Sequence, residues 1–196
     1  NYYDIHITTM PHVITSIPVP SDNSAASLNF TRALYTTPST GDKSVVFENR
    51  VVINATTTQG DVDVIIPTGL KVNGTSSWDG KLKLASYALT SDISLSNQVV
   101  DLNKKFGSDD VDLTFSAPVK MTFTGKSDKN VGVEFVNGTE RLISTECIAD
   151  DLTQVTTQLS SSTTGDCKIT SGSDLIVYTK HFTSFFTSSS SSSSSS

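Results

Sequence analysis

A chain of 196 residues can bury one substantial hydrophobic core, and its formal net charge of −6 with 14 scattered basic residues excludes the clustered Lys and Arg that nucleic acids select. No run of about 18 apolar residues is present, so we expect neither a membrane span nor a nucleic-acid partner. Ser and Thr together make up 58 residues, a composition typical of extracellular β-proteins.

Residues 1–22 differ from the rest of the chain and are predicted to form an extended N-terminal arm. The first nine residues are rich in strand formers, and three prolines between residues 11 and 20 limit the arm to edge positions in a sheet. The residues assigned to assembly through this arm are Tyr3, Ile5, Ile7, Val13 and Ile14. Such an arm either pairs with the edge of its own domain or completes the sheet of a neighbouring subunit as a donor strand.

Short strand signals separated by turn residues recur through residues 23–187. The predicted strands lie at 28–35, 44–54, 61–66, 70–72, 81–85, 93–95, 99–102, 111–115, 119–123, 131–136 and 141–147. A polar interruption within 44–54 marks either a bulge or the junction of two strands. Asn73-Gly74 and Asn137-Gly138 are predicted as tight turns, and residues 152–159 fit either a short helix or a strand. This spacing, without a sustained helical period, predicts an all-β fold, an antiparallel β-sandwich.

Residues 174–186 are predicted to form the strand that closes the sandwich. Apolar side chains fall on both faces of this stretch, which favours a central position over an edge. Residues 188–196 are all serine and are predicted to form a flexible spacer or an O-glycosylated stalk, with Ser188, Ser189 and Ser190 as candidate sites. The expected organisation is therefore an arm at 1–22, a sandwich at 23–187 and a serine tail at 188–196.

Cys147 and Cys167 are the only cysteines and are predicted to pair as a disulfide, since two thiols without a nearby His make an incomplete metal site. Closing the loop between them would stabilise the folded state by about 3 kcal/mol. Four N-x-[ST] sequons predict N-linked glycans on Asn29, Asn54, Asn73 and Asn137. With a first residue that is not Met, these features indicate a processed chain that is secreted or displayed at the cell surface.

Other residue clusters give weaker indications of chemistry. Asp61 and Asp63 share a strand face, and further acids lie in loops at 109–112 and 150–151, but none has the spacing of a calcium-binding loop. We therefore expect no metal and no cofactor. Trp78 is interpreted as a core or rim anchor, with stacking on a sugar ring as the alternative.

His181-Phe182-Thr183 resembles the cleavage triplet of GAIN domains, the autoproteolytic β-sandwiches of adhesion receptors. That resemblance implies His181 as base, Thr183 as nucleophile and a scissile bond after Phe182. The close C-x-C pair that precedes the histidine in that family is absent, because Cys167 lies 14 residues upstream. Apart from this self-cleavage, we expect no enzymatic activity.

A longer pattern, from I-P-x-G near residue 66 to D-L-I-V-Y-T-K-H-F-T-x-F at the end, resembles poorly characterised secreted and cell-surface β-domains of microbes. The arm and the serine tail are also similar to features of glycosylated extracellular fibril subunits. These resemblances imply a structural subunit of an extracellular filament or surface layer, whose partners are copies of itself and covalently attached glycans. The alternatives are a carbohydrate-binding or adhesive module and the self-cleaving domain.

Overall fold

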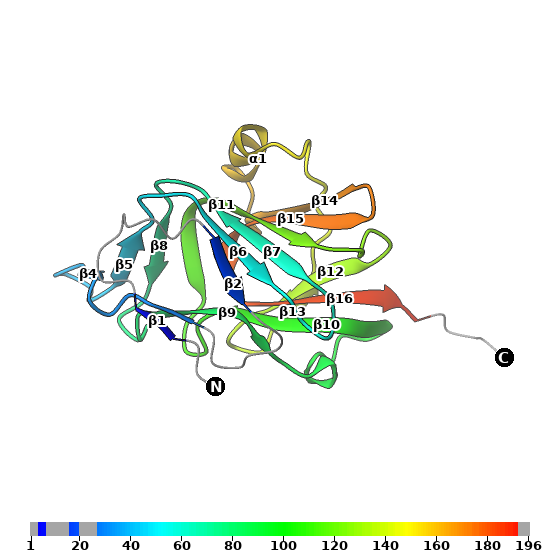
Figure 1. Ribbon diagram of the computed structural model, residues 1–196, viewed down its shortest axis with the longest axis horizontal. Coiled ribbons are helices and arrows are strands. Elements are labelled where there is room, and N and C mark those ends of the chain that lie inside the picture. The colour runs from blue at the N-terminus through cyan, green and yellow to red at the C-terminus, as the bar shows by residue number, and fades with distance from the viewer. Residues whose placement is uncertain (1–3, 7–15, 20–26, 192–196) are drawn as a thin grey trace.

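The computed structural model describes residues 4–6, 16–19 and 27–191, which form two β-sheets packed as a sandwich (Figure 1). The first sheet runs in the order β1 (Asp4–His6), β3 (Ser27–Asn29), β9 (Lys81–Tyr87), β10 (Gln98–Gly107), β16 (Ser184–Ser190), β12 (Asn130–Glu134) and β13 (Glu140–Leu142). The predicted all-β sandwich is confirmed.

The second sheet contains β2 (Ser16–Val19), β6 (Val51–Ala55), β7 (Val62–Ile66), β11 (Leu113–Phe123), β8 (Lys71–Gly74), β5 (Lys43–Val46) and β4 (Tyr35–Thr36), with β15 (Asp174–Phe182) and β14 (Asp166–Ser171) beyond β11. The long strand β11 organises this sheet. Its first residues pair with β8, its last residues pair with β7, and both parts pair with β15 on the other side.

The main core lies between the two sheets and follows from alternation along the strands. In β6 and β7 every second residue is buried, with Ile53 and Val64 facing each other in the register. The partly exposed residues between them face outwards, because successive side chains of a strand point to opposite faces. The predicted 44–54 run is thus two strands, β5 and β6, with the buried Phe47 and the polar residues 48–50 at their junction.

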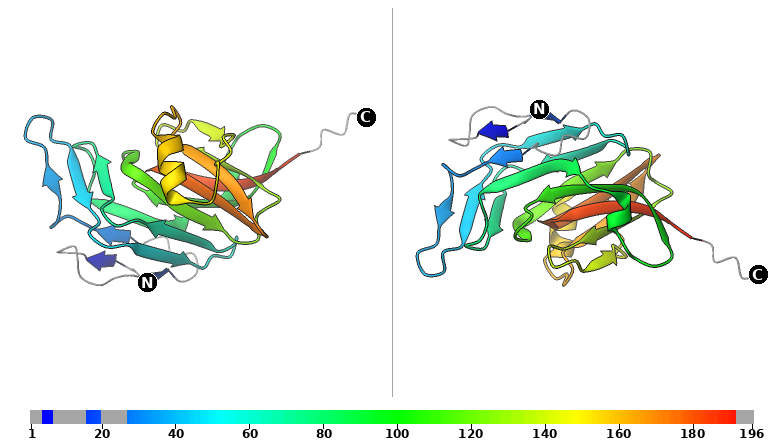
Figure 2. Two further views of the ribbon diagram at one scale, coloured as in Figure 1. Left: turned by 90° about the horizontal axis from the view of Figure 1, so that it is seen from above. Right: turned by 90° about the horizontal axis from the view of Figure 1, so that it is seen from below.

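Strand β15 is apolar on both faces because it separates two clusters. Leu175 and Val177 face the main core, whereas Ile176 and Tyr178 pack in a second cluster with the helix α1 (Leu152–Leu159). Figure 2 shows α1 lying over the β14–β15 hairpin. The predicted central position of this strand is confirmed, and residues 152–159 are resolved as a helix.

Several local expectations were wrong. Residues 28–35 do not form one strand, because β3 and β4 lie in different sheets and a turn separates them. Residues 174–186 are two strands in different sheets, joined at Thr183, rather than one. Asn73-Gly74 ends β8 instead of forming a turn, and a Cβ on Gly74 would lie 2.8 Å from that of Trp78, so this glycine makes room for the indole. Residues 93–95 connect the 3-10 turn η1 (Thr90–Asp92) to β10. Of the predicted 141–147 strand, only residues 141 and 142 lie in a named strand, β13.

Strand β16 continues three residues beyond the expected end of the sandwich at 187, into the serine tract. It lies between β10 and β12, in the interior of its sheet. The termini of the described chain therefore differ in character, since β1 and β2 add to sheet edges whereas β16 lies inside a sheet.

Candidate functional site

The two described strands of the N-terminal arm, β1 and β2, lie on the edges of the chain's own sandwich. Strand β1 pairs with β3 at the edge of one sheet, and β2 pairs with β6 at the edge of the other. Both pairings are parallel, whereas the other pairs of named strands in the described ranges are antiparallel. The arm therefore joins an antiparallel framework as two added edge strands, which is the geometry of strand addition.

Strand β2 contributes side chains to the main core. Ile17 is 1% exposed and lies opposite Ile53, and Val19 is 3% exposed and lies opposite Ala55. Burial of each of these two side chains stabilises the folded chain by about 1.5–3 kcal/mol. Of the arm residues predicted to carry assembly, Ile5 lies in β1, while Tyr3, Ile7, Val13 and Ile14 fall outside the described residues. The sequence thus indicated the arm but missed Ile17 and Val19, whose alternation around a proline was the available signal.

Pro18 shapes the outer side of β2. The Val19 carbonyl accepts a hydrogen bond from the Thr56 N–H at 3.0 Å, so the backbone of Val19 faces β6. Because alternate residues of a strand direct their backbone groups to opposite sides, the backbone of Pro18 faces away from β6. Proline has no N–H, so this edge lacks a donor that an incoming strand would need.

A buried polar cluster lies where β15 leads into β16. Asp166 Oδ2 is 2.7 Å from His181 Nε2 and 2.5 Å from an Arg141 guanidinium nitrogen, and its Oδ1 accepts a second Arg141 hydrogen bond at 3.1 Å. Arg141 also donates to the Thr164 carbonyl at 3.3 Å and lies over the Phe135 ring. The cluster links β13, β14 and β15, which belong to different sheets.

The electrostatics of this cluster favour the charged carboxylate. Burial raises the pKa of Asp166, but hydrogen bonds and positive charge from His181 and Arg141 outweigh it and hold this pKa below 3.8. With Nε2 directed at Asp166, His181 Nδ1 is buried without a hydrogen-bond partner among the described residues. The histidine ring stacks on Phe185, whose centroid is 6.0 Å away.

Thr183 is the single residue between β15 and β16 and is buried. Its hydroxyl donates to the Glu134 carbonyl, and its own carbonyl accepts from the Phe106 N–H at 3.1 Å. It borders a cleft of about 90 Å³ that is also lined by Lys105, Asp109 and Ser184. The structure thus places His181 and Thr183 at one strand junction, with the Thr183 hydroxyl engaged by Glu134.

Glu134 lines the same cleft and faces Glu140 across the β12–β13 hairpin. Burial raises the pKa of Glu134, and the neighbouring Glu140 carboxylate raises it further through charge and a shared hydrogen bond. Lys105 acts in the opposite direction but does not cancel these effects.

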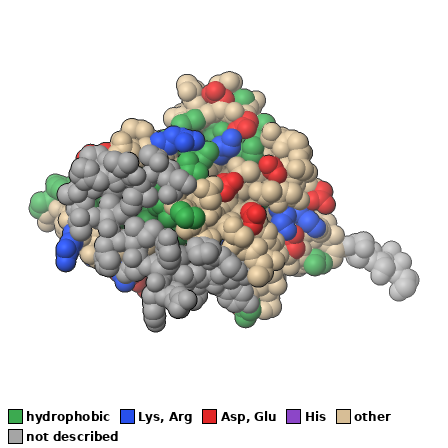
Figure 3. All heavy atoms as spheres, in the orientation of Figure 1, with side chains coloured by type: hydrophobic (Ala, Val, Ile, Leu, Met, Phe, Trp, Pro, Cys, Tyr) green, Lys and Arg blue, Asp and Glu red, His purple; other side chains and the backbone are tan. Residues whose placement is uncertain are grey.

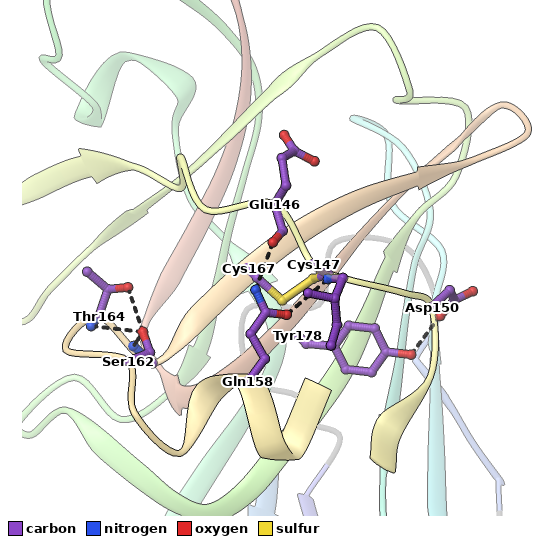
Figure 4. The surroundings of a disulfide bond; sticks show 10 residues. Glu146, Cys147, Asp150, Gln158, Ser162, Thr164, Cys167 and Tyr178 are labelled. Atoms are coloured by element: carbon purple, nitrogen blue, oxygen red, sulfur yellow. Dashed lines mark hydrogen bonds between the residues drawn. A yellow bond between two sulfur atoms is a disulfide. The ribbon is translucent and has the colours of Figure 1, made fainter. Parts of the chain in front are cut away.

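The structure contains the Cys147–Cys167 disulfide, with the Cα atoms 5.0 Å apart (Figure 4). Gln158 of α1 accepts from the Ile148 N–H at 3.0 Å and donates to the Glu146 carbonyl at 2.8 Å. The Tyr178 hydroxyl donates to Asp150 at 2.6 Å. These bonds attach the helix and the segment before it to β15.

The four sequons occupy different environments. Asn137 is exposed in the β12–β13 turn, which confirms the predicted hairpin, and its Oδ1 accepts from the Thr139 N–H at 2.9 Å. Asn54 is exposed but donates to Asp63 at 2.9 Å, and Asn73 is partly buried in β8. Asn29 is 8% exposed in β3. Of the four, Asn137 offers the most open attachment point for a glycan.

Side chains of neighbouring segments form hydrogen bonds with the first residues of the serine tract. Ser188 is buried and donates to Gln98 at 2.7 Å, while Lys129 donates to Ser189 at 2.8 Å. Ser190 is exposed and accepts from Asn130 at 3.3 Å. A buried Ser188 hydroxyl is not available to a glycosyltransferase in the folded chain, so Ser190 is the accessible one of the three candidates.

Trp78 is fully buried, and its indole N–H donates to the Lys81 carbonyl at 2.8 Å. Its ring therefore has no exposed face for a sugar, and the carbohydrate-binding alternative loses the residue on which it rested.

Within the described ranges no group of three or more His, Cys, Asp or Glu side chains could hold a metal ion, and no helix is long and apolar enough to cross a membrane. Charged side chains of both signs are interspersed on the face in Figure 3.

Arg141 and Asp166 were not identified from the sequence as a functional pair with His181. They lie 25 residues apart and meet because β13 and the first residue of β14 lie close to His181, near the β15–β16 junction. Comparison with protein-family models, with curated proteins and with solved structures finds no match.

Proposed function

We propose that this protein is a structural subunit of an extracellular filament or surface layer, and that subunits join head to tail by exchanging the N-terminal arm. The observation that carries the proposal is the seating of β2, which pairs in parallel with β6 and buries Ile17 and Val19 in the core. An arm of this kind makes the same contacts when it is donated by a neighbouring copy. The edge of β6 that pairs with β2, here called the acceptor edge, is identical in every subunit.

Pro18 supports exchange over simple edge-to-edge growth. An exposed strand edge is a template for uncontrolled pairing, and a missing backbone donor weakens it. Since β2 presents Pro18 on its outer side, a further strand gains little by adding beyond it. Growth then proceeds through replacement of one β2 by another, which gives an open chain of heterologous contacts.

The chemistry of the chain supports an extracellular location. The disulfide is stable in oxidising compartments, and the exposed Asn137 sequon matches a glycosylated surface. In this proposal the partners are further copies of the chain and covalently attached glycans.

Negative-stain electron microscopy of the full chain tests the proposal. We expect filaments from the wild type and none from Ile17→Asp, because a carboxylate cannot enter the core of either the same subunit or a neighbour. The matched control is Tyr35→Ser, which removes a side chain that is 62% exposed at the β4 edge and should leave filaments intact. A wild-type chain that remains monomeric at all concentrations contradicts the proposal.

A second candidate function is self-cleavage between Phe182 and Thr183. It is favoured by the Asp166–His181 hydrogen bond, which orients the ring beside the strand junction and leaves Nδ1 without a partner in the described part of the chain. The hydroxyl of Thr183 would first have to leave the Glu134 carbonyl. Intact-mass analysis under denaturing conditions, with Thr183→Ala as the uncleavable control, decides between one chain and two fragments.

A further inference from the structure

We propose that the chain's own arm caps its acceptor edge, so that the free monomer is a closed form and release of β2 from β6 precedes each step of assembly. This inference rests on the proposed arm exchange and concerns its regulation. It follows from where the single chain places its own β2.

The acceptor edge is filled along the whole length of β2. Four consecutive residues pair with β6, from Ser16 opposite Val52 to Val19 opposite Ala55. The Thr56 N–H continues the ladder by donating to the Val19 carbonyl. A neighbour's arm cannot occupy this edge at the same time, because one strand edge offers one set of backbone donors and acceptors.

Exchange conserves the contacts that it breaks. The leaving β2 and the arriving β2 bury the same Ile17 and Val19 side chains against the same Ile53. Little free energy is therefore gained at this edge when one arm replaces another, and the barrier is the opening of the seated strand. Assembly should then be slow, and its rate should become independent of monomer concentration once opening is limiting.

A reversible lock tests the cap. The double variant Ser16→Cys with Val52→Cys joins two register partners of β2 and β6 while leaving the core residues unchanged. The matched controls are the two single-cysteine variants. Monomer is oxidised before assembly, confirmed as an internal cross-link by mass and by mobility in denaturing gels without reductant, and then followed by light scattering and microscopy.

We expect the locked monomer to form no filaments, and to form them at the rate of the single-cysteine controls after selective reduction of the engineered bond. Filaments grown reduced and oxidised afterwards should show cross-links between chains, seen as a ladder of covalent oligomers. Locked monomer that assembles at the control rate overturns the cap while leaving a filament function in place. Absence of filaments from the wild type and from every variant, locked or reduced, instead overturns the proposed function itself.

Discussion

The ring of Phe186 occupies the space that a side chain on Gly132 would need. The two residues are opposite each other in the β12–β16 register, and a Cβ on Gly132 would overlap the Phe186 ring and come within 2.7 Å of the Arg141 carbonyl oxygen. Gly132 has no positive φ, so its requirement for glycine is steric. Strand β16 can therefore pack closely against β12 because Gly132 has no side chain.

Gly132→Ala is expected to lower the free energy of unfolding by about 1–3 kcal/mol, the cost of inserting a methylene into a packed core. Chemical denaturation measures the change. Gly125→Ala is the control, because nothing lies within 4 Å of its Cβ and only its φ of 71° opposes the substitution. Combining Gly132→Ala with Phe186→Leu should recover part of the loss, and a purely additive double variant would contradict the steric explanation.

Asp166→Asn is expected to destabilise the fold by about 3 kcal/mol, since it leaves Arg141 and His181 near a site that no longer carries charge. The pKa of Asp166 is lowered by folding, so its stabilising contribution is present above its ordinary value of 3.8 and is lost as the pH falls through the lower folded value. In this pH range the free energy of unfolding of the variant should therefore depend less on pH than that of the wild type. Asp109→Asn, in a half-exposed pair with Lys83, should change stability by less than about 1 kcal/mol.

Glu134→Gln is expected to stabilise the protein at neutral pH and to have no such benefit near pH 4. Folding raises the pKa of Glu134 above 4.5, so the protonated form is favoured in the folded state and the advantage is lost as the pH rises through the folded value. An uncharged amide avoids the repulsion from Glu140. Thermal unfolding of both proteins from pH 4 to pH 8 should show the difference growing with pH, and a constant offset would contradict it.

A mature, folded sample from a eukaryotic secretory host should carry a glycan on Asn137 and none on Asn29. The Asn137 side chain is exposed at a turn, whereas Asn29 is buried and its Oδ1 accepts from the Thr31 N–H at 3.0 Å. Glycopeptide mass spectrometry after proteolysis reports occupancy at each site. A fully occupied Asn29 in folded protein would show that β3 does not keep the observed pairing.

The sequence predicted the elements whose signals are local. Alternation in residues 61–66 and the Asn137-Gly138 dipeptide each specify a strand or a turn within a few residues, and both are present. The disulfide was predictable because the chain has only two cysteines, which can pair with each other in one way. The apolar character of β15 on both faces also predicted its central position, although not the helix that covers one of those faces.

The features that were missed depend on contacts between distant segments. Nothing near Asp166 indicates that it will meet Arg141, because their approach is set by the order of strands across the sandwich. Asn73-Gly74 has the composition of a turn, but packing of Trp78 against Gly74 decides its conformation. The serines of β16 are not strand formers by themselves. Hydrogen bonds from Ser188 to Gln98 and from Lys129 to Ser189 help to hold them in the strand.

The central position of β16 has a consequence for the order in which the sandwich is completed during synthesis. Strands β10 and β12 leave the ribosome well before residues 184–190, yet they are joined to each other only through β16. Until that segment emerges, each presents an open edge and the apolar surface that Phe185 and Phe186 later cover. The nascent chain therefore remains exposed to wrong pairing until nearly its last described residue, and completion of this sheet coincides with emergence of the serine tract.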